Sequence, residues 1–392
     1  MSRGTAGDVV PFLKIGSVLA GMNNDVLLVT HCYYEQAVHR AGLQFAALDT
    51  PREFEAFVKD GPLLETTSGL LEFSKKHVFP QTRSEITLLD GWCQKKGVVL
   101  VTRHMASIAA PLICERYRLP LVTVFVSAAQ ANCFHLWTEF CRSLLADVIN
   151  GFRAELELPR IHDWRAWVNI PSCFLACWPQ WFSPRTSVWP GHTKHVGFLL
   201  SDATETGKLV REVEHLLDLK PPPVLISGGT SVSTMSRRFY AAAAAACYLA
   251  CRTAILVCRH KELIPDPLPP GIRCFRQLPF ASIVPRVAAL IHHGGASTMV
   301  RAAASGVPQL ILPFGADRPH NAACIERVGL GLQVRASDWE PSRVFRELER
   351  VIDSASIRHT LSEIPGRLLS PVDLENACTM IEGVANHAIR HW

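Results

Sequence analysis

The chain of 392 residues lacks the features that mark several classes of protein. No run reaches the roughly 20 apolar residues that a membrane span needs. Residues 1–10 (MSRGTAGDVV) contain no apolar core of a secretory signal peptide. The formal net charge is only +5 and the basic residues are scattered, which disfavours nucleic-acid binding. These absences predict a cytoplasmic protein without a membrane span or a nucleic-acid partner, and they leave peripheral membrane contact open.

The thirteen cysteines include no Cys-x-x-Cys pair, the spacing that is typical of zinc and redox motifs. Cys173 and Cys177 are one helical turn apart, as are Cys247 and Cys251, but nothing nearby in the sequence completes a metal site. The simpler interpretation is that these are small buried side chains in a reducing compartment. We therefore expect neither a metal nor a cofactor.

Short apolar runs alternate with helical patterns along the chain, which indicates a parallel α/β architecture. Hydrophobic residues make up 48% of the chain, enough to build sizeable cores. The apolar runs predict strands at residues 25–30, 98–102, 121–126, 224–227, 254–258, 288–291 and 309–312. The helical patterns predict helices at residues 107–117, 238–250, 298–305 and 321–328.

Residues 201–223 separate two halves of the chain. They contain a polar stretch, a helical segment and three prolines at 221–223, which stiffen a connector. We therefore expect Rossmann-like domains at residues 1–200 and 224–370. A helical tail, residues 371–392, follows. Packing on the first domain and packing on the second fit this tail equally well, and we expect it to cross back to the first.

The strongest sign of function is residues 288–298, which read AALIHHGGAST. An apolar strand ends in two histidines, two glycines follow, and a helix begins. Glycine lets the backbone approach a ligand closely, and the N–H groups and dipole of a helix start attract an anion such as a diphosphate. His292 at the strand end can donate a hydrogen bond to a phosphate oxygen. Most histidines near strand ends are structural, so the prediction depends on the complete string.

Two further strand ends carry polar groups. Asp317 follows strand 309–312, at the edge where open α/β sheets bind ligands, and its carboxylate can accept hydrogen bonds from two vicinal sugar hydroxyls. The alternative role for Asp317 is a helix N-cap. After strand 224–227, Gly229 and Thr230 can offer N–H and hydroxyl contacts to phosphate, although many strand-to-helix turns look similar.

Residues 277–331 resemble the donor-binding signature of the UDP-glycosyltransferase superfamily, which has the GT-B fold of two Rossmann-like domains facing each other across a cleft. The matching segments are 279–285 (PFASIVP), 292–295 (HHGG), 304–309 (ASGVPQ) and 313–317 (PFGAD). Residues 4–11 (GTAGDVVP) resemble the acceptor-domain motif of the bacterial and sterol-type members. Residues 178–182 (WPQWF), with 189–190 and 196–198, resemble the rhamnosyltransferases of rhamnolipid synthesis.

The resemblance implies an inverting transfer without a metal, from a UDP- or dTDP-sugar to a hydroxyl of a lipophilic small molecule. The chain has no Asp-x-Asp motif, which argues against the metal-dependent GT-A type. Asp8 is the implied base, with His31 and His104 as rivals and helix capping as its alternative role. The implied donor-binding residues are Gly229, Thr230, Pro279, His292, Gly294, Gly295, Ala296, Ser297, Asp317 and Arg318. The implied acceptor-binding residues are His104, Trp178, Trp181 and Phe182, although tryptophans are also common in cores.

Two features depart from the family pattern. Arg318 stands where the family usually has glutamine, and arginine cannot accept a hydrogen bond from a sugar hydroxyl. We expect a surface arginine beside an altered pocket; an acidic sugar is the other possibility. Only residues 1–3 precede Gly4, and three residues are too few for a strand, with Ser2 and Arg3 unsuited to a core. We therefore expect either that the central strand of the first sheet is missing or that the start of the chain is placed too late. Such a chain is expected to fold poorly.

Two rival functions remain open. A nucleotide-sugar 2-epimerase shares the GT-B fold but needs acid and base carboxylates around the sugar instead of an acceptor pocket. The aromatic stretch at 178–182 favours the transferase over the epimerase. A catalytically inactive or auxiliary homologue would tolerate both the short start and Arg318. Fold alone does not distinguish these functions.

Overall fold

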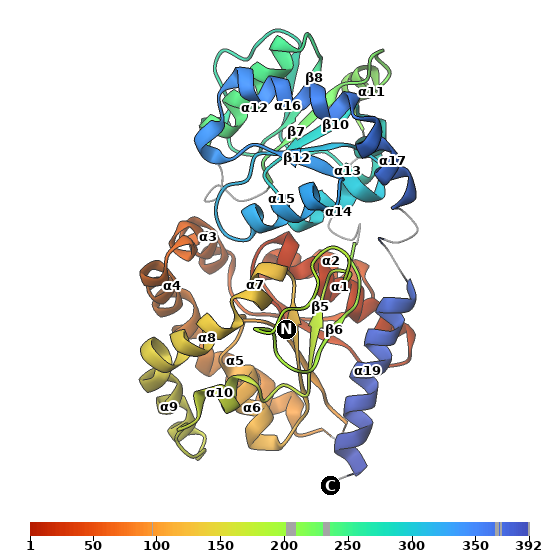
Figure 1. The fold of residues 1–392 in the computed structure, drawn as a ribbon. Helices are drawn as coiled ribbons and strands as arrows, with labels where there is room; N and C mark the ends of the chain where they lie inside the picture. Colours follow the sequence, from red (N-terminus) through yellow and green to blue (C-terminus); the bar gives the residue numbers. More distant parts are fainter. Residues whose placement is uncertain (96, 201–208, 230–235, 365–367, 369–370, 391–392) are drawn as a thin grey trace. The chain divides into compact units, whose positions relative to one another are not determined.

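The computed structural model describes residues 1–95, 97–200, 209–229, 236–364, 368 and 371–390. The chain divides into two compact units (Figure 1). The first unit is Met1–Ala203 with Pro371–Trp392, and the second is Thr204–Ser370. Both units are built on parallel sheets, so the predicted fold class, two Rossmann-like α/β units, is confirmed.

The second unit contains a six-stranded parallel sheet in the order β12-β11-β10-β7-β8-β9. The chain runs outward from β7 to β9, then returns to place β10 on the other side of β7. The topological switch point therefore lies between β7 and β10, and open α/β sheets bind ligands beyond the carboxyl ends of the strands at this point. The strands are β7 (Val224–Ser227), β8 (Ala254–Val257), β9 (Ile272–Phe275), β10 (Ala289–His292), β11 (Gln309–Ile311) and β12 (Gly331–Gln333).

Helices cover both faces of this sheet. Figure 1 shows α12 and α16 on one side and α14 and α15 on the other. The run of alanines in α12 lets this helix pack closely on β7, β8 and α16. The helices of the second unit are α11 (Arg211–Leu217), α12 (Arg237–Leu249), α13 (Phe280–Ile283), α14 (Ala296–Ala304), α15 (Arg318–Arg327), α16 (Pro341–Asp353) and α17 (Ala355–Glu363).

The expected connector at residues 201–223 is not all connector. Its helical part is α11, and Val213 and Leu217 on this helix lie in one hydrophobic cluster with Leu225 of β7. Both α11 side chains are buried, because the helix presents an apolar face to the sheet. Residues 201–208 lie outside the described residues.

The first unit contains a four-stranded parallel sheet, β3-β4-β5-β6, and a separate parallel pair, β1-β2. The strands are β1 (Leu27–Thr30), β2 (Gln44–Ala47), β3 (Leu100–Arg103), β4 (Leu121–Phe125), β5 (Cys173–Ala176) and β6 (Thr193–His195). The helices on this sheet system are α1 (Ala6–Gly21), α2 (Glu35–Arg40), α3 (Pro51–Lys59), α4 (Thr67–Phe73), α5 (Phe79–Cys93), α6 (Ala109–Tyr117), α7 (Ala128–Asn132), α8 (Phe134–Phe140), α9 (Ala146–Glu155), α10 (Trp164–Val168) and α19 (Pro371–Arg390).

Residues 1 and 2 lie between β1 and β3 and join the two sheets through the backbone. Ser2 N–H donates to the carbonyl of Val29 (3.0 Å), and Arg103 N–H donates to the carbonyl of Met1 (3.0 Å). The amino terminus of Met1 donates to the carbonyl of Val101 (2.6 Å). These two residues therefore occupy the place at which the sequence analysis expected a missing central strand.

Ser2 and Arg3 are buried, contrary to the expectation that they are unsuited to a core. The Ser2 hydroxyl and the two terminal nitrogens of Arg3 have partners, which makes burial tolerable. Ser2 Oγ donates to the carbonyl of Asp8 (2.8 Å). Arg3 pairs with the carboxylate of Glu85 and donates to the carbonyl of His77 (2.6 Å).

The C-terminal helix α19 belongs to the first unit, where it lies beside α1 (Figure 1). Leu374, Cys378 and Ile381 on α19 lie in one core cluster with Leu13 and Ile15 of α1. The two ends of the chain therefore build part of the same core.

All thirteen cysteines are free thiols, and nine of them are buried as small side chains of the cores. Within the described residues, no three His, Cys, Asp or Glu side chains gather as ligands for a metal ion. Of the helices in the described part of the chain, none is both long enough and apolar enough to cross a membrane.

Candidate functional site

The two strands beside the switch point of the second unit each end in a glycine turn. Gly229 follows β7 and Gly294 follows β10, and both have φ +93°. The strand ends Ser227 and His292 are aligned in register, so the two turns are neighbours. Glycine adopts a positive φ without the steric cost that other residues bear, and its backbone leaves room for a ligand. The paired turns form a surface of backbone groups at the switch point.

The turn after β10 leads directly into α14. Gly295 is the N-cap residue and has no side chain to occupy the first N–H groups of the helix. Ala296 and Ser297, the first two helical residues, are partly exposed. The positive end of the helix dipole thus lies at the carboxyl edge of the sheet, an arrangement that binds phosphate groups.

His292 is completely buried and turned into the protein. Its Nδ1 accepts a hydrogen bond from Gly294 N–H (3.1 Å), and its Nε2 lies 3.0 Å from the side-chain oxygen of Gln309. Because Nδ1 is an acceptor, Nε2 carries the proton and donates to Gln309. Burial lowers the pKa of His292 to about 4, so the ring is neutral. The sequence analysis expected His292 to contact phosphate, but in the structure both ring nitrogens hold the turn in place.

His293 is the histidine that lies against the glycine turns. A Cβ added to Gly229 would lie 2.8 Å from His293 Nε2, and one added to Gly295 would lie 2.5 Å from it. Within the described residues, His293 Nδ1 is buried without a hydrogen-bond partner. Burial, and then the charges of Arg318 and His292, hold the pKa of His293 well below its ordinary value. His293 was not among the predicted contacts; the sign of its position in the sequence is the pair of glycines, which leave space for an imidazole.

Asn321 of α15 links the loop after β11 to the turn after β10. Its side-chain amide donates to the carbonyl of Gly294 (3.0 Å) and to Asp317 Oδ2 (3.2 Å). Asp317 is half-buried at the N-cap position of α15, but its side chain makes no capping hydrogen bond. Asn321 therefore orients one carboxylate oxygen of Asp317. The sequence analysis did not identify Asn321, because nothing in the local pattern shows that it reaches Gly294.

Arg318 is buried, whereas a surface arginine was expected. Its Nη1 donates to the carbonyl of Phe314 (2.5 Å). A Cβ on Gly294 would lie 3.1–3.2 Å from the carbonyl oxygen and Cβ of Arg318, so the arginine backbone closes one side of the turn. Its positive charge contributes to the low pKa of His293. Arg318 therefore belongs to the inner part of the site.

Two other expected donor-binding residues are less informative. Pro279 is buried, and its carbonyl accepts hydrogen bonds from Ser282 and Ile283 N–H at the start of α13. Thr230 lies outside the described residues.

In the first unit, Asp8 lies in the first turn of α1. Its Oδ2 accepts hydrogen bonds from Thr5 N–H (2.8 Å) and Thr5 Oγ1 (3.2 Å), and its Oδ1 lies 3.4 Å from Arg103 Nη1. The alternative role that the sequence left open, capping of the helix, is therefore present in the structure. The side chain is 23% exposed, so the carboxylate is anchored but accessible.

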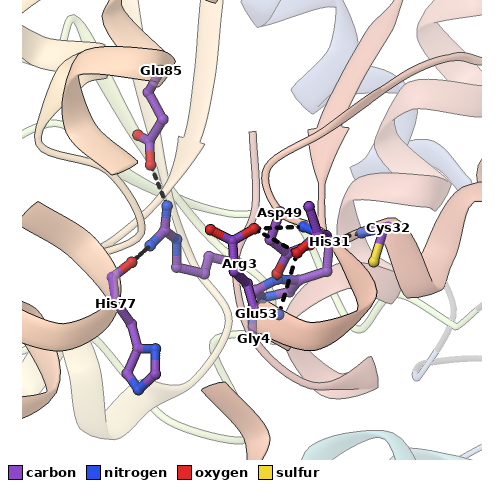
Figure 2. Close-up of polar contacts among 9 residues, drawn as sticks. Arg3, Gly4, His31, Cys32, Asp49, Glu53, His77 and Glu85 are labelled. Atoms are coloured by element: carbon purple, nitrogen blue, oxygen red, sulfur yellow. Dashed lines mark hydrogen bonds and ion pairs between the residues drawn. The ribbon is translucent and has the colours of Figure 1, made fainter. Parts of the chain in front are cut away.

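His31, one of the rival bases, follows β1 and is almost completely buried. Its Nε2 accepts a hydrogen bond from Gly4 N–H (2.9 Å), and its Nδ1 lies 2.5 Å from Asp49 Oδ2 (Figure 2). Asp49 Oδ1 accepts a hydrogen bond from Cys32 N–H (2.9 Å). Nε2 is therefore committed to Gly4 and cannot also accept a proton from a substrate.

Residues 253–379 match the family described as erythromycin biosynthesis protein CIII-like, C-terminal domain. Over 97% of the chain, the sequence is 29% identical to 96% of the O-mycaminosyltylonolide 6-deoxyallosyltransferase of Streptomyces fradiae. Over 99% of the chain it is 23% identical to the sterol 3-beta-glucosyltransferase of Pichia angusta, but it spans only 33% of that relative's length.

Solved glycosyltransferase structures match the fold of this chain over nearly its whole length. The glycotransferase of kitacinnamycin has a TM-score of 0.72 at 17% identity, with 98% of this chain and 97% of that one covered. The glycosyltransferase VinC, solved in complex with dTDP, has a TM-score of 0.70 at 18% identity, with coverages of 97% and 96%. The chain has the GT-B glycosyltransferase fold. These comparisons give no support to the expected likeness to the rhamnosyltransferases of rhamnolipid synthesis.

His104, expected to line the acceptor site of this GT-B chain, is a core residue at the end of β3. Its ring packs against Phe125 (4.9 Å between ring centroids), Phe134 (5.6 Å) and Trp137 (5.7 Å). Burial lowers the pKa of His104 to about 3, so the ring is neutral at ordinary pH. A base that is uncharged but enclosed by aromatic rings has no path to a substrate hydroxyl, which removes His104 as a rival to Asp8.

The expected acceptor-binding aromatic residues are also largely core. Trp178 is buried and donates from Nε1 to the carbonyl of Ser183 (3.0 Å). Phe182 is buried against Phe198, with 4.9 Å between ring centroids. Only Trp181 is partly exposed. The aromatic content of this segment is explained by packing of the first unit, as the alternative interpretation of the tryptophans held.

Proposed function

We propose that the chain is a glycosyltransferase that moves a hexosyl or deoxyhexosyl group from a UDP- or dTDP-sugar to a hydroxyl of a lipophilic small molecule. The observation that carries this proposal is the pair of positive-φ glycine turns at the switch point of the second sheet. The turn after β10 leads into the start of α14, whose first backbone N–H groups are offered to a nucleotide diphosphate, and the glycines leave room for it to approach.

His293 and Arg318 complete the proposed diphosphate site. His293 lies against both glycine turns, and its buried Nδ1 has no partner within the described residues. In the tautomer with its proton on Nδ1, the neutral imidazole donates to a phosphate oxygen. The guanidinium charge of Arg318, close enough to His293 to lower its pKa, stabilises the negative charge that builds up on the leaving diphosphate.

Asp317 is the proposed contact to the sugar. Asn321 binds its Oδ2, which orients the carboxylate at the edge where the diphosphate is bound. The second carboxylate oxygen then accepts hydrogen bonds from the sugar hydroxyls. Arg318, beside Asp317, is the residue we expect to influence which sugar is accepted.

Asp8 is the proposed base. The acceptor oxygen attacks the anomeric carbon from the face opposite the breaking bond to the diphosphate, so the configuration inverts. Asp8 takes the hydroxyl proton during this attack. Thr5 and Arg103 hold the carboxylate in one orientation. We propose that the transfer needs no metal, in keeping with the lack of an Asp-x-Asp motif in the chain.

The names of two relatives support a lipophilic acceptor. The sterol 3-beta-glucosyltransferase and the O-mycaminosyltylonolide 6-deoxyallosyltransferase are both aligned over nearly the whole of this chain. The dTDP bound to VinC supports a nucleotide diphosphate donor.

Calorimetric titration of the full chain with dTDP and with UDP tests the donor site. We expect at least one of them to bind, and His293→Ala to weaken binding more than tenfold, because a hydrogen bond to a charged group contributes about 1.5–3 kcal/mol. His359→Ala, an exposed histidine of the same unit, is the control and should bind like the parent. No binding of either nucleotide, or equal binding by His293→Ala, would refute this site.

A further inference from the structure

Each unit contains a buried histidine that accepts a hydrogen bond from a glycine N–H at a positive φ. In the second unit His292 binds Gly294 N–H, and in the first unit His31 binds Gly4 N–H. Gly294 has φ +93° and Gly4 has φ +139°. In both cases the other ring nitrogen faces an oxygen of a side chain from elsewhere in the unit, Gln309 for His292 and Asp49 for His31.

In the first unit, His31 and Asp49 are held by several further contacts. Asp49 is bound by the ring of His31 and by Cys32 N–H, so the carboxylate has partners on both oxygens (Figure 2). The rings of Phe54 and Phe57 pack on His31, with centroids 4.9 and 4.5 Å away. Because Nε2 accepts from Gly4, the proton of the neutral ring is on Nδ1, where Asp49 accepts it.

Gly4 connects this pair to Asp8. A Cβ on Gly4 would lie 2.2 Å from Asp8 Oδ2, so the bare Cα of Gly4 is the surface against which the carboxylate rests. The segment before Gly4 is held by the sheet, and Arg3 extends to the opposite side, toward His77 and Glu85 (Figure 2). His31 is the side chain that holds the N–H of Gly4 itself.

We propose that His31 and Asp49 are positioning residues for Asp8: by holding Gly4 they set the place of the carboxylate that acts as the base. This inference rests on the proposed function, in which Asp8 removes the acceptor proton. It assigns His31 a role that the sequence alone did not suggest, since His31 was a rival to Asp8 there. It also gives a role to Asp49, a buried carboxylate that accepts a hydrogen bond from His31 Nδ1.

The groups that face His31 decide what its protonation does. Asp49 and Asp8 favour the charged ring, whereas burial and the charge of Arg3 oppose it; burial is the largest effect, and it lowers the pKa of His31. The neutral ring is the form that accepts from Gly4. A charged ring would present an N–H to Gly4 N–H, two donors facing each other, and would release the turn.

Two substitutions at His31 separate its hydrogen bond from its packing. Phenylalanine fills the space between Phe54 and Phe57 but cannot accept from Gly4 N–H. Glutamine carries an amide oxygen at the distance of Nε2 and can accept. We expect His31→Phe to lower kcat more than tenfold with little change in the KM for the donor sugar, and His31→Gln to recover most of the loss. His39→Phe, at an exposed histidine of the same unit, is the matched control and should keep the parent's kcat.

A double-mutant cycle shows whether His31 acts through Asp8. If it does, His31→Phe should cause little further loss of kcat when added to Asp8→Asn, because the base is already gone. Independent losses that multiply would overturn the positioning role. So would a His31→Phe variant that keeps the parent's kcat.

Hydrogen exchange of the peptide that contains residues 3–10 reads the contact without catalysis. We expect faster exchange of this peptide in His31→Phe than in the parent, and recovery in His31→Gln. Unchanged exchange would overturn the contact even in an active enzyme. The exchange can change as expected while the parent transfers no sugar from any UDP- or dTDP-donor. In that case the proposed function fails, and the positioning role fails with it. Nucleotide titration of the second unit is a separate result.

Discussion

Replacing His104 removes a buried titrating group from the core of the first unit. The ring is 5% exposed and surrounded by Phe125, Phe134 and Trp137. Burial, and then the nearby charge of Arg103, lower its pKa from 6.5 to about 3. The unfolded chain therefore binds a proton that the folded chain excludes, so His104 makes the free energy of unfolding fall as the pH drops from 6.5 toward 3.

The size of this effect follows from the distance in pH. A pH of 5 is about 1.5 units below the pKa of His104 in the unfolded chain and still above its pKa in the folded chain. At about 1.36 kcal/mol per unit, His104 lowers the free energy of unfolding by about 2 kcal/mol between pH 8 and pH 5. The figure holds for any folded pKa well below 5. Other buried histidines, such as His292, whose pKa is about 4, add to the acid sensitivity of the parent.

Urea unfolding of the full chain at pH 8 and pH 5 measures the contribution of His104 by difference. His104→Phe places an apolar ring among aromatic neighbours and cannot titrate. We expect its loss of unfolding free energy between the two pH values to be smaller than the parent's by about 2 kcal/mol. His135→Phe, an exposed histidine on α8, should lose as much as the parent. If His104→Phe loses as much as the parent too, the ring is not excluded from water as the structure shows it.

Two further predictions concern the second unit. Gly294→Ala forces a side chain onto φ +93° and places its Cβ 3.1–3.2 Å from Arg318, so we expect strain of about 1–3 kcal/mol, a lower Tm and weaker nucleotide binding. Gly383→Ala, with nothing within 4 Å of the added Cβ, is the control. An unchanged Tm and an unchanged affinity in Gly294→Ala would contradict the geometry of the turn. Arg318→Gln removes the buried charge beside His293, and we expect the relative activities with neutral hexose donors to change. Arg343→Gln, at an exposed arginine, is the control. Relative activities identical to the parent's, or an equal change in Arg343→Gln, would show that Arg318 does not select the sugar.

All seven predicted strands are present, with ends within two residues of the prediction. Each is a short, mainly apolar run, which is the pattern of a strand in a parallel sheet. Strands β1 and β3 keep this pattern although they are partly exposed. Strands β2, β5, β6, β9 and β12 were not predicted. Of these, β2, β6, β9 and β12 are short and partly exposed, and tertiary pairing, not composition, makes them strands. Strand β5 is fully buried but only four residues long, so burial alone did not make it predictable.

The candidate site shows the same division at the level of single residues. The string of residues 292–295 identified the glycine turn and the helix start, since both depend on local chain chemistry. It did not show which histidine lies against the glycine turns. Gln309, which comes from the next strand, binds His292 and leaves His293 against Gly229. A contact between strands is invisible in a local pattern.

The sequence by itself determined the parallel α/β class, the two apolar cores and the glycine-rich turn after β10, because each is encoded in neighbouring residues. Only the tertiary structure decided that Met1 and Ser2 join two sheets, that α19 packs on the first unit, and that the aromatic residues around Trp178 are core. It also decided that His31 Nε2 accepts the hydrogen bond of Gly4 N–H. Each of these outcomes depends on which distant segments meet, and the free energy that selects them comes from burial and hydrogen bonding between residues far apart in the chain.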